Sequence, residues 1–475
     1  MLNKFVLILF GATGDLAQNK LIPSLFSLFI QNKLPKDFFI YGFARRELNN
    51  EDFGNFFPEQ KMHIQWNDFS KHLFYQTGNF DEDKGYAELV QHLEALDSKM
   101  GECILRIFYL ATPPINYPSI LSHLEKSRLS EGLGQGTKNL TKIAIEKPFG
   151  KDVETSKMLD QKLSEIFEEE QIFRVDHYLG KETIQNLLVF RFANGIFEPI
   201  WNKEYIDHVQ ITWAEQKGIK DRGKFFDGVG ILRDAGQNHL MQILAAVAMD
   251  MPKSFSKEGV RDARAKAIKT LKFIDPKDVS HQVVRGQYVG YKDEKDVSKD
   301  STTETFVATK FFLDSERFAD IPFYMRAGKS LKENLVEVSI VFKQTCHILF
   351  KEVGCPEEGN VLKIRIQPNE GIILKIIAKT PGSKLQLAPV DMHFLYKEEF
   401  GTQGMDAYEK ILTDILTGDQ MLFNRSDELQ SSWTFIENIL KGWENPEVPI
   451  YSYEKGSWGP GEADHLLEKD GRKWL

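Results

Sequence analysis

Four chemically different side chains stand within six consecutive positions, from Asp176 to Lys181. They are the carboxyl of Asp176, the imidazole of His177, the phenol of Tyr178 and the ammonium of Lys181. An apolar Phe-x-Val run precedes them, which is typical of a strand that ends in a polar site. We interpret the cluster as facing a small anionic ligand; the alternative is a polar strand end with no ligand.

A second histidine, His239, stands in a polar patch that begins at Asp234 and precedes an apolar helical pattern. One interpretation is structural, with Asp234 or Asn238 capping that helix. The other is a functional imidazole, which Asp176 could orient by hydrogen bonding. The residues alone leave both interpretations open.

The elements that position these residues begin with a strand-and-helix alternation over residues 1 to about 145. Continuous apolar runs predict short buried strands at Phe5–Phe10, Phe38–Phe43, Ile107–Ala111 and Lys142–Ile145. Helical spacing joins Leu21, Leu25, Leu28 and Phe29, and again Tyr86, Leu89, Leu93 and Leu96. Pro23 is expected to end the first turn of its helix or to kink it. This alternation predicts a parallel sheet covered on both faces.

Beyond about residue 176 the pattern changes. A helix is predicted over Glu182–Phe192, followed by strands at Val209–Ala214, Thr305–Phe312, Glu337–Phe342, Val361–Ile366 and Gly371–Ala378. Several of these strands alternate polar and apolar residues, as half-exposed antiparallel strands do. The fold class predicted is α/β: a Rossmann-like dinucleotide-binding domain over 1–175, then a larger α+β domain with a big, mainly antiparallel sheet over 176–475.

The first predicted strand leads into a glycine-containing turn, Gly11-Ala12-Thr13-Gly14-Asp15-Leu16-Ala17, and then a helix. Glycines let backbone N–H groups approach a pyrophosphate, and a helix N-terminus favours its charge. The spacing is G-x-x-G rather than G-x-G-x-x-G, so a purely structural tight turn is the alternative.

Two arginines, Arg45 and Arg46, follow the second predicted strand. An Arg at this place accommodates the 2′-phosphate of NADP, whereas NAD sites carry an acid there. The arginine pair favours NADP as the coenzyme. Glu47 is an acid close enough to leave NAD as an alternative, and a third interpretation is that both arginines belong to a solvated loop.

Lys147 follows another predicted strand, and Pro148 comes directly after it. Ligands bind outside the carboxyl ends of strands in such sheets, so Lys147 is expected to reach between cofactor and substrate. Whether the bond before Pro148 is cis or trans stays open.

Composition narrows the class of protein. The chain has 475 residues and a net charge of −9, which argues against nucleic acid as a general partner. No apolar stretch is long enough to span a membrane, and Phe5–Phe10 predicts a core strand rather than an export signal. Cys103, Cys346 and Cys355 have no metal-ligand spacing and fit a reduced, cytoplasmic compartment. We expect no metal site.

The motifs together resemble those of the glucose-6-phosphate dehydrogenase family. The likeness covers essentially the whole chain, and the stretch Arg174–Glu182 is its most diagnostic part. The other matching segments are Gly11–Ala17, Glu146–Gly150, Gln237–His239, Pro322–Lys329, Gly418–Gln420, Arg425–Glu428 and Gly456–Pro460.

The resemblance implies oxidation of glucose 6-phosphate at C1 to 6-phosphogluconolactone, with hydride transfer to NADP, as the first oxidative step of the pentose phosphate pathway. It implies that His239 is the general base and Asp176 the carboxylate that orients it. Substrate residues implied by the likeness are Lys20, Lys147, His177, Tyr178, Lys181, Glu215, Asp234 and Lys329. Cofactor residues implied or predicted are Gly11, Thr13, Gly14, Asp15, Leu16, Arg45, Arg46 and Lys147. A homodimer or homotetramer is also expected.

Two positions depart from the family pattern. Asn334 stands where a basic residue is usual, with Lys332 nearby, and Phe225-Phe226 replaces a pair of tyrosines before Asp227. Two other functions stay open: a catalytically silent NADP-binding regulator of the same fold, and an oxidoreductase of an unphosphorylated sugar or polyol. The intact set of Asp176, His177, Lys181 and His239 argues against the first, and His177 with Lys181 argues against the second.

Overall fold

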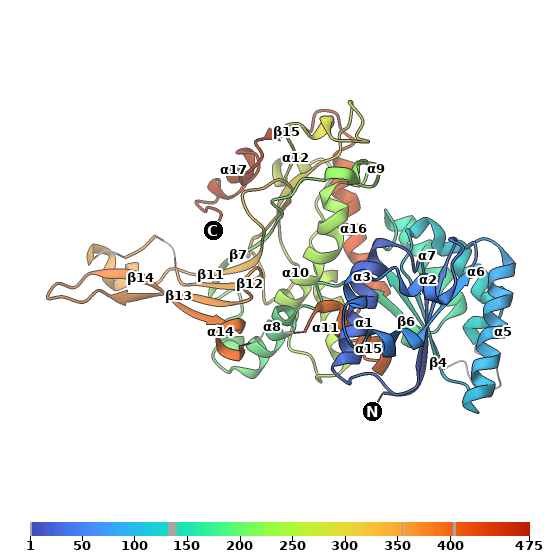
Figure 1. Cartoon of the computed structure of the whole chain (residues 1–475). Helices are drawn as coiled ribbons and strands as arrows, with labels where there is room; N and C mark the ends of the chain where they lie inside the picture. Colours follow the sequence, from blue (N-terminus) through green and yellow to red (C-terminus); the bar gives the residue numbers. More distant parts are fainter. Residues whose placement is uncertain (1, 132–139, 354, 358, 402–404) are drawn as a thin grey trace. The chain divides into compact units, whose positions relative to one another are not determined.

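The polypeptide divides into two compact units, each assembled from separate stretches of sequence. A computed structural model describes residues 2–131, 140–353, 355–357, 359–401 and 405–475 (Figure 1). The first unit comprises Met1–Gly180, Phe255–Arg261 and Met405–Ser426, and the second comprises Lys181–Ser254, Asp262–Gly404 and Asp427–Leu475. The first unit thus includes two segments from beyond residue 250. The domain limits 1–175 and 176–475 stay predictions.

The first unit is built on a parallel sheet in the order β3-β2-β1-β4-β5-β6. Its strands are β1 (Phe5–Phe10), β2 (Phe38–Ala44), β3 (Leu73–Thr77), β4 (Leu105–Leu110), β5 (Thr141–Glu146) and β6 (Ile172–Val175). This is the strand order of a dinucleotide-binding Rossmann fold. The four strands predicted from apolar runs are confirmed, the first with the same bounds.

Helices cover this sheet because its strands are apolar on both faces. All six residues of β1 are buried, and so are all six of β4. The helices in this unit are α1 (Ile22–Ile30), α2 (Asn50–Gly54), α3 (Pro58–Lys61), α4 (Trp66–Phe69), α5 (Asp83–Met100), α6 (Tyr117–Lys126), α7 (Val153–Ile166) and α15 (Ala407–Thr417).

The helix α15 comes from far along the sequence and packs on α1. Its Tyr408, Ile411 and Ile415 belong to the same apolar core as Phe173 and Val175 of β6. Sequence periodicity within residues 1–175 had no means to reveal this contribution.

Pro23 is the second residue of α1, yet it does not open the helical run. A π-helix, η1 (Ala17–Leu21), leads directly into α1 at Ile22. The proline therefore stands at a change of helix type, close to the first-turn break that the sequence predicted.

The second unit contains a nine-stranded mixed sheet in the order β14-β13-β12-β11-β7-β10-β9-β8-β15. Its neighbouring strands are antiparallel except for the parallel pairs β7–β10 and β8–β15. The strands are β7 (Ile206–Ala214), β8 (Val283–Tyr288), β9 (Phe306–Phe311), β10 (Phe323–Gly328), β11 (Leu335–Phe342), β12 (Val361–Gln367), β13 (Gly371–Lys379), β14 (Leu387–Leu395) and β15 (Ile450–Tyr453). The large, mainly antiparallel sheet predicted for this region is confirmed.

A continuous helical run lies against this sheet. It consists of the π-helix η9 (Leu232–Leu240) and α10 (Met241–Ala248), and η9 contacts both β7 and β10. The other helices are α8 (Glu182–Ala193), α9 (Gly223–Phe226), α11 (Lys257–Lys269), α12 (Val279–Gln282), α13 (His347–Phe350), α14 (Tyr396–Phe400), α16 (Ser426–Gly442) and α17 (Glu462–Glu468), with the first residues of α11 and α16 belonging to the first unit. Every residue of α10 is buried, so α10 is the central helix of this unit.

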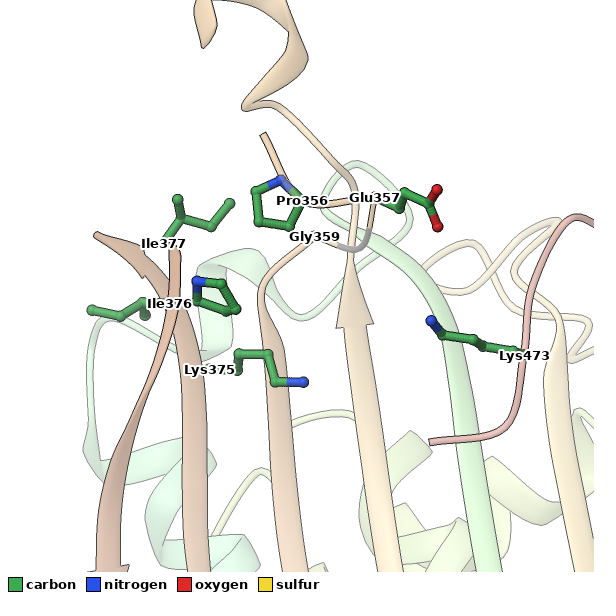
Figure 2. A pocket seen from close by; sticks show the side chains of 8 residues that line it. Pro356, Glu357, Gly359, Lys375, Ile376, Ile377 and Lys473 are labelled. Atoms are coloured by element: carbon green, nitrogen blue, oxygen red, sulfur yellow. The ribbon is translucent and has the colours of Figure 1, made fainter. Parts of the chain in front are cut away.

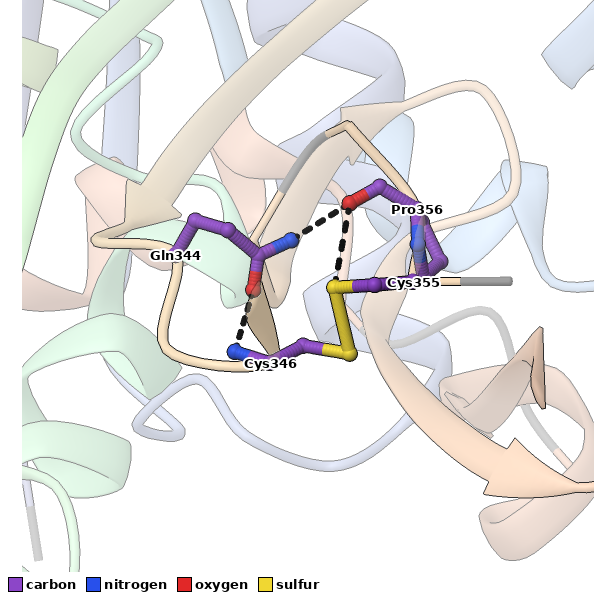
Figure 3. Close-up of a disulfide and its surroundings, with 4 residues drawn as sticks. All are labelled: Gln344, Cys346, Cys355 and Pro356. Carbon is purple, nitrogen blue, oxygen red and sulfur yellow. Dashed lines mark hydrogen bonds between the residues drawn. A yellow bond between two sulfur atoms is a disulfide. The ribbon is translucent and has the colours of Figure 1, made fainter. Parts of the chain in front are cut away.

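Two of the three cysteines, which were expected to be reduced, are paired in the structure. Cys346 and Cys355 form a disulfide, with Cα atoms 5.8 Å apart, in the connection between β11 and β12 (Figure 3). Gln344 joins both sides of this loop, since its amide accepts from the backbone N–H of Cys346 and donates to the carbonyl of Pro356. Nine positions separate the two cysteines, and no local motif marks them as partners.

Within the described residues, no helix has both the length and the apolar character needed to cross a bilayer. The cytoplasmic location stays a prediction.

Candidate active site

The carboxyl ends of the parallel strands carry most of the first unit's predicted site residues. Gly11 follows β1, Arg45 follows β2, Lys147 follows β5 and Asp176 follows β6. Because parallel strands end at one edge of their sheet, all four residues lie along that edge.

Glycine is required in the turn after β1 because the end of a neighbouring strand approaches the turn closely. Gly11 has φ +88°, and a Cβ there would lie 2.5 Å from the carbonyl oxygen of Ala111 after β4. The N–H of Gly14 donates to the Gly11 carbonyl at 2.8 Å, which closes the turn. The side-chain amide of Gln18 donates to the backbone carbonyl of Thr13. Asp15 is exposed, and its carboxylate accepts from the side-chain amide of Asn19. The turn lies at the β1–β4 switch point of the sheet, where dinucleotide-binding folds hold the pyrophosphate.

Arg45 and Arg46 are exposed after β2. The backbone of Arg46 is nevertheless fixed, since the hydroxyl of Tyr75 donates to its carbonyl at 2.8 Å and its guanidinium lies over the ring of Phe56. Both cations are therefore available to an anionic ligand at this sheet edge. Lys20, on η1, is also exposed.

Lys147 follows a buried acid, Glu146, for which no role was predicted. The hydroxyl of Tyr109 donates to Oε1 of Glu146 at 2.6 Å, and that of Tyr408 donates to the same oxygen at 3.3 Å. Burial raises the pKa of Glu146 to about 7, despite these hydrogen bonds. The Lys147–Pro148 peptide bond is cis.

The segment after β6 is a tight turn rather than a continued strand. The N–H of Leu179 donates to the Asp176 carbonyl at 3.1 Å, and the Asp176 carboxylate accepts from the N–H of Tyr178 at 3.0 Å. The Asp176 carboxylate therefore stabilises a turn at this point.

His177 stays half-buried in this turn. Its ring is offset-stacked on that of Tyr408, with centroids 6.0 Å apart and planes 13° apart. The start of α15 also closes on the turn, since a Cβ on Gly180 would lie 3.0 Å from the Ala407 carbonyl oxygen. Tyr178 is buried beside His177. The start of α15 thus holds the turn that carries the predicted phosphate ligands.

The second unit gathers three of its predicted substrate residues around one ammonium. Nζ of Lys329 lies 2.7 Å from Glu215 and 3.4 Å from Asp234. The Lys329 side chain is buried, and its Nζ also lies over the rings of Trp213 and Phe226. Lys329 follows β10 and Glu215 follows β7, so the parallel pairing of these strands brings the two residues together.

His239 and Asp234 both belong to η9, and His239 is buried. The prediction that Asp234 or Asn238 caps this helix is wrong, because both lie inside it and its N-cap position is Ile231. Asn238 instead bonds within the helix: its amide donates to the Arg233 carbonyl, and its side-chain oxygen accepts from the N–H of His239.

Both departures from the family pattern have structural roles. The side-chain oxygen of Asn334 accepts from the N–H of Gln216 at 2.9 Å, which holds the residue after Glu215. Phe226, which replaces a tyrosine, supplies one of the ring faces under Lys329. Lys332, by contrast, is exposed.

The predicted residues fall into one group in each unit. The first contains Gly11, Thr13, Gly14, Asp15, Leu16, Lys20, Arg45, Arg46, Lys147, Asp176, His177 and Tyr178, and the second contains Lys181, Glu215, Asp234, His239 and Lys329. Lys181 stands immediately before α8, at its N-cap position. The pairing of Asp176 with His239 stays a prediction.

A separate pocket of about 220 Å³ lies beside β13 and the disulfide loop, with Lys375, Lys473, Glu357 and Pro356 among its lining residues (Figure 2). None of the predicted site residues lines it.

Comparison with known proteins identifies the family. The model of the "Glucose-6-phosphate dehydrogenase, NAD binding domain" matches residues 8–186, and that of the "Glucose-6-phosphate dehydrogenase, C-terminal domain" matches residues 188–475. The chain belongs to the glucose-6-phosphate dehydrogenase family.

Relatives in this family match along nearly the whole chain. A glucose-6-phosphate 1-dehydrogenase of Chlamydia pneumoniae is 42% identical, with 99% of this chain and 95% of the relative covered. The enzyme of the same name from Aggregatibacter actinomycetemcomitans is 41% identical, with 98% and 96% covered.

Solved structures of glucose-6-phosphate dehydrogenases resemble this chain over its full length. A glucose-6-phosphate dehydrogenase in complex with its substrate glucose 6-phosphate superposes with a TM-score of 0.91 at 35% identity, covering 100% of this chain and 99% of that one. The glucose-6-phosphate 1-dehydrogenase of Mycobacterium avium gives 0.85 at 32% identity, covering 100% and 99%.

Proposed function

We propose that this chain is a glucose-6-phosphate 1-dehydrogenase that oxidises C1 of glucose 6-phosphate to the lactone. The observation that carries the proposal is the likeness, over the full length of both chains, to a solved dehydrogenase that holds glucose 6-phosphate. The alternative of a silent regulator of the same fold has no observation in its favour.

His239 takes the proton of the C1 hydroxyl in this proposal, and Asp176 orients its imidazole. An imidazole is suited to this step because its pKa lies near neutral pH, where it can accept and release a proton. Loss of that proton lets C1 form a carbonyl as its hydride departs.

Glu215, Asp234 and Lys329 hold the sugar. The two carboxylates supply hydrogen-bond acceptors for the sugar hydroxyls, and the buried ammonium supplies donors. The ion pairs between them fix all three side chains in place. Lys147 and Lys20 complete this set.

The phosphate is bound by His177, Tyr178 and Lys181. The stacking of His177 on Tyr408 supports this role, because a ring held in one orientation loses little freedom when the anion binds. Charge-assisted hydrogen bonds from Lys181 supply the strongest attraction.

NADP is the coenzyme in this proposal, with NAD as the alternative. The dinucleotide accepts the hydride from C1 when it is bound. Gly11, Thr13, Gly14, Asp15 and Leu16 form its pyrophosphate turn, and the place of this turn at the β1–β4 switch point supports the role. Arg45 and Arg46 bind the 2′-phosphate, which their exposure after β2 supports.

A homo-oligomer, dimer or tetramer, completes the proposal. Its support is β14, an edge strand that exposes Val390 and Met392 in the second unit. Figure 1 shows the β13–β14 hairpin extending beyond the rest of its sheet. An exposed apolar edge of this kind is suited to pairing with a second copy.

The test is an assay of reduced-nicotinamide absorbance with glucose 6-phosphate and each coenzyme in turn. Turnover is expected with glucose 6-phosphate and NADP, and far less with glucose. Absence of turnover with both coenzymes would overturn the proposed activity. Sedimentation velocity before and after Val390→Lys with Met392→Lys tests the oligomer, and an unchanged monomer in both preparations would exclude it.

A further inference from the structure

The helical run that carries His239 and Asp234 begins without a cap of its own. The N-cap position of η9 is Ile231, whose side chain has no hydrogen-bonding atom. Helix N-termini leave backbone N–H groups without intrahelical partners, and these need an acceptor when they are buried. The acceptor here comes from another part of the sequence.

That acceptor is Glu304, which stands just before β9 and is buried. Its Oε1 accepts from the N–H of Leu232, the first residue of η9, at 3.0 Å. Its backbone carbonyl accepts from the N–H of Ile231, also at 3.0 Å. One residue therefore satisfies two successive N–H groups at the entry to the helix.

The chain before the helix is shaped around this carboxylate. Gly230 has φ +76°, and a Cβ there would lie 2.2 Å from Oε1 of Glu304. Only glycine leaves the space that the carboxylate occupies. The neighbouring Thr303 hydroxyl accepts from the N–H of Gly228 at 2.7 Å, so two adjacent residues fasten the approach to η9.

The same segment also fixes Lys329. The N–H of Lys329 donates to the Thr305 carbonyl at 2.9 Å, and the hydroxyl of Tyr453 donates to the carbonyls of both residues. Lys329 in turn contacts Asp234 on η9. Residues 303–305 thus connect the ammonium with the helix that carries the proposed base.

The other end of the run is held by hydrogen-bond donors from another helix. The guanidinium of the buried Arg191, on α8, donates to the carbonyls of Ala246 and Val247 at 3.0 Å each. An acceptor at the N-terminus and a donor at the C-terminus each satisfy backbone groups that the helix leaves without partners. The two ends differ in their distance from the site: Leu232 is two residues from Asp234, whereas Ala246 lies seven residues beyond His239.

We infer that Glu304 is a positioning residue of the active site: by capping η9 it sets the place of Asp234 and His239 relative to Lys329. The inference rests on the proposed function of His239. Glu304 does not touch the substrate in this scheme; it acts through the helix.

The physical form of the carboxyl supports a geometric role. Burial raises the pKa of Glu304 to about 7, so the group holds a proton for part of the time near neutral pH. An acceptor oxygen is present in both protonation states. Glutamine carries an amide oxygen at the same distance from the backbone and can replace it.

The test compares Glu304→Ala with Glu304→Gln in the full chain. Glu304→Ala is expected to lower kcat by about tenfold or more, since misplacement of a catalytic group by about 1 Å can cost on the order of 100-fold. The KM for NADP should stay unchanged, because the coenzyme residues lie on other elements. Glu304→Gln should restore kcat to nearly the original value. If Glu304→Ala does not fold, Glu304→Asp replaces it, because a side chain one methylene shorter cannot reach Leu232.

Arg191→Lys is the matched control, since it weakens the cap at the far end of the same helical run. It should lower the melting temperature while leaving kcat nearly intact. A loss of kcat equal to that of Glu304→Ala would mean that general loosening of the helix, rather than positioning, explains the effect.

His239→Asn, measured in parallel, separates this inference from the proposed function. If His239→Asn keeps full turnover, the base assignment fails. If His239→Asn is inactive while folded Glu304→Ala turns over normally, or if Glu304→Gln is as impaired as Glu304→Ala, the positioning role alone is overturned.

Discussion

The ammonium nitrogen of Lys329 lies 2.7 Å from Oε2 of Glu215. Parallel pairing of β10 with β7 brings the two residues together, and Asp234 approaches the same nitrogen at 3.4 Å. One buried cation thus holds two carboxylates that would otherwise repel each other. The pair depends on sheet register, not on nearness in sequence.

Replacement of this cation should affect both binding and stability. Lys329→Met removes the ammonium that lies over Trp213 and Phe226 and contacts two acids. We expect a loss of about 1.5–3 kcal/mol in the free energy of unfolding, because charged hydrogen bonds are typically of that size. The KM for glucose 6-phosphate should rise at the same time. Lys277→Met, at an exposed position of the same unit, is the control and should change neither quantity.

Lys181 should act on the phosphate alone. Lys181→Ala is expected to weaken glucose 6-phosphate binding by about 1.5–3 kcal/mol, the size of a charged hydrogen bond. Glucose has no anion for this ammonium, so its much weaker use as a substrate should hardly change. Steady-state kinetics with both sugars measure the difference. Equal losses for the two sugars would contradict the phosphate role.

The arginine pair should determine coenzyme preference. Arg45→Ala with Arg46→Ala removes both cations that follow β2, and we expect the NADP/NAD ratio of kcat/KM to fall by roughly tenfold or more, equivalent to about 1.4 kcal/mol. Most of the fall should come from KM for NADP. Lys33→Ala, a charge removal elsewhere on the same unit, is the control. An unaltered ratio in the double variant would remove the basis for assigning NADP.

Glu146 should make stability depend on pH. Its pKa is raised from 4.5 to about 7 in the folded chain, so the folded state binds the proton more tightly than the unfolded state. The stabilisation that comes from the protonated Glu146 is complete below about pH 4.5 and is lost as pH rises through 7. The free energy of unfolding should fall by about 3 kcal/mol over this range.

Urea unfolding of Glu146→Gln at pH 5 and pH 8 measures this contribution, because the amide stays neutral at both values. From pH 5 to pH 8, the free energy of unfolding of the variant should rise by on the order of 2–3 kcal/mol relative to that of the unaltered chain. The surface variant Glu94→Gln should show no such change. A constant difference between Glu146→Gln and the unaltered chain would contradict the raised pKa.

Much of the fold followed from the sequence where the physics is local. The buried strand Phe5–Phe10 was predicted with its observed bounds, because a strand covered on both faces is continuously apolar. The glycine turn followed for a similar reason: Gly11 occupies a left-handed φ that other residues avoid.

The parts that escaped prediction depend on contacts between distant stretches. Tyr408 is 231 residues beyond His177, yet the two rings stack. Glu304 caps a helix that begins 72 residues earlier. Neither relationship leaves a periodic or local signal, and both acids, Glu146 and Glu304, look like ordinary charged residues in the sequence. Their burial beside polar partners is a property of the folded chain alone.

The turnover of His239→Asn tests the central claim most directly. Asparagine retains polar side-chain atoms but cannot accept the C1 proton at neutral pH, so kcat should fall by about 100- to 10,000-fold, the usual contribution of a general base. Binding of glucose 6-phosphate, measured by calorimetry on the same preparation, should stay within about threefold, a change of less than about 1 kcal/mol. A folded His239→Asn protein that turns over glucose 6-phosphate at nearly the original rate would contradict the account.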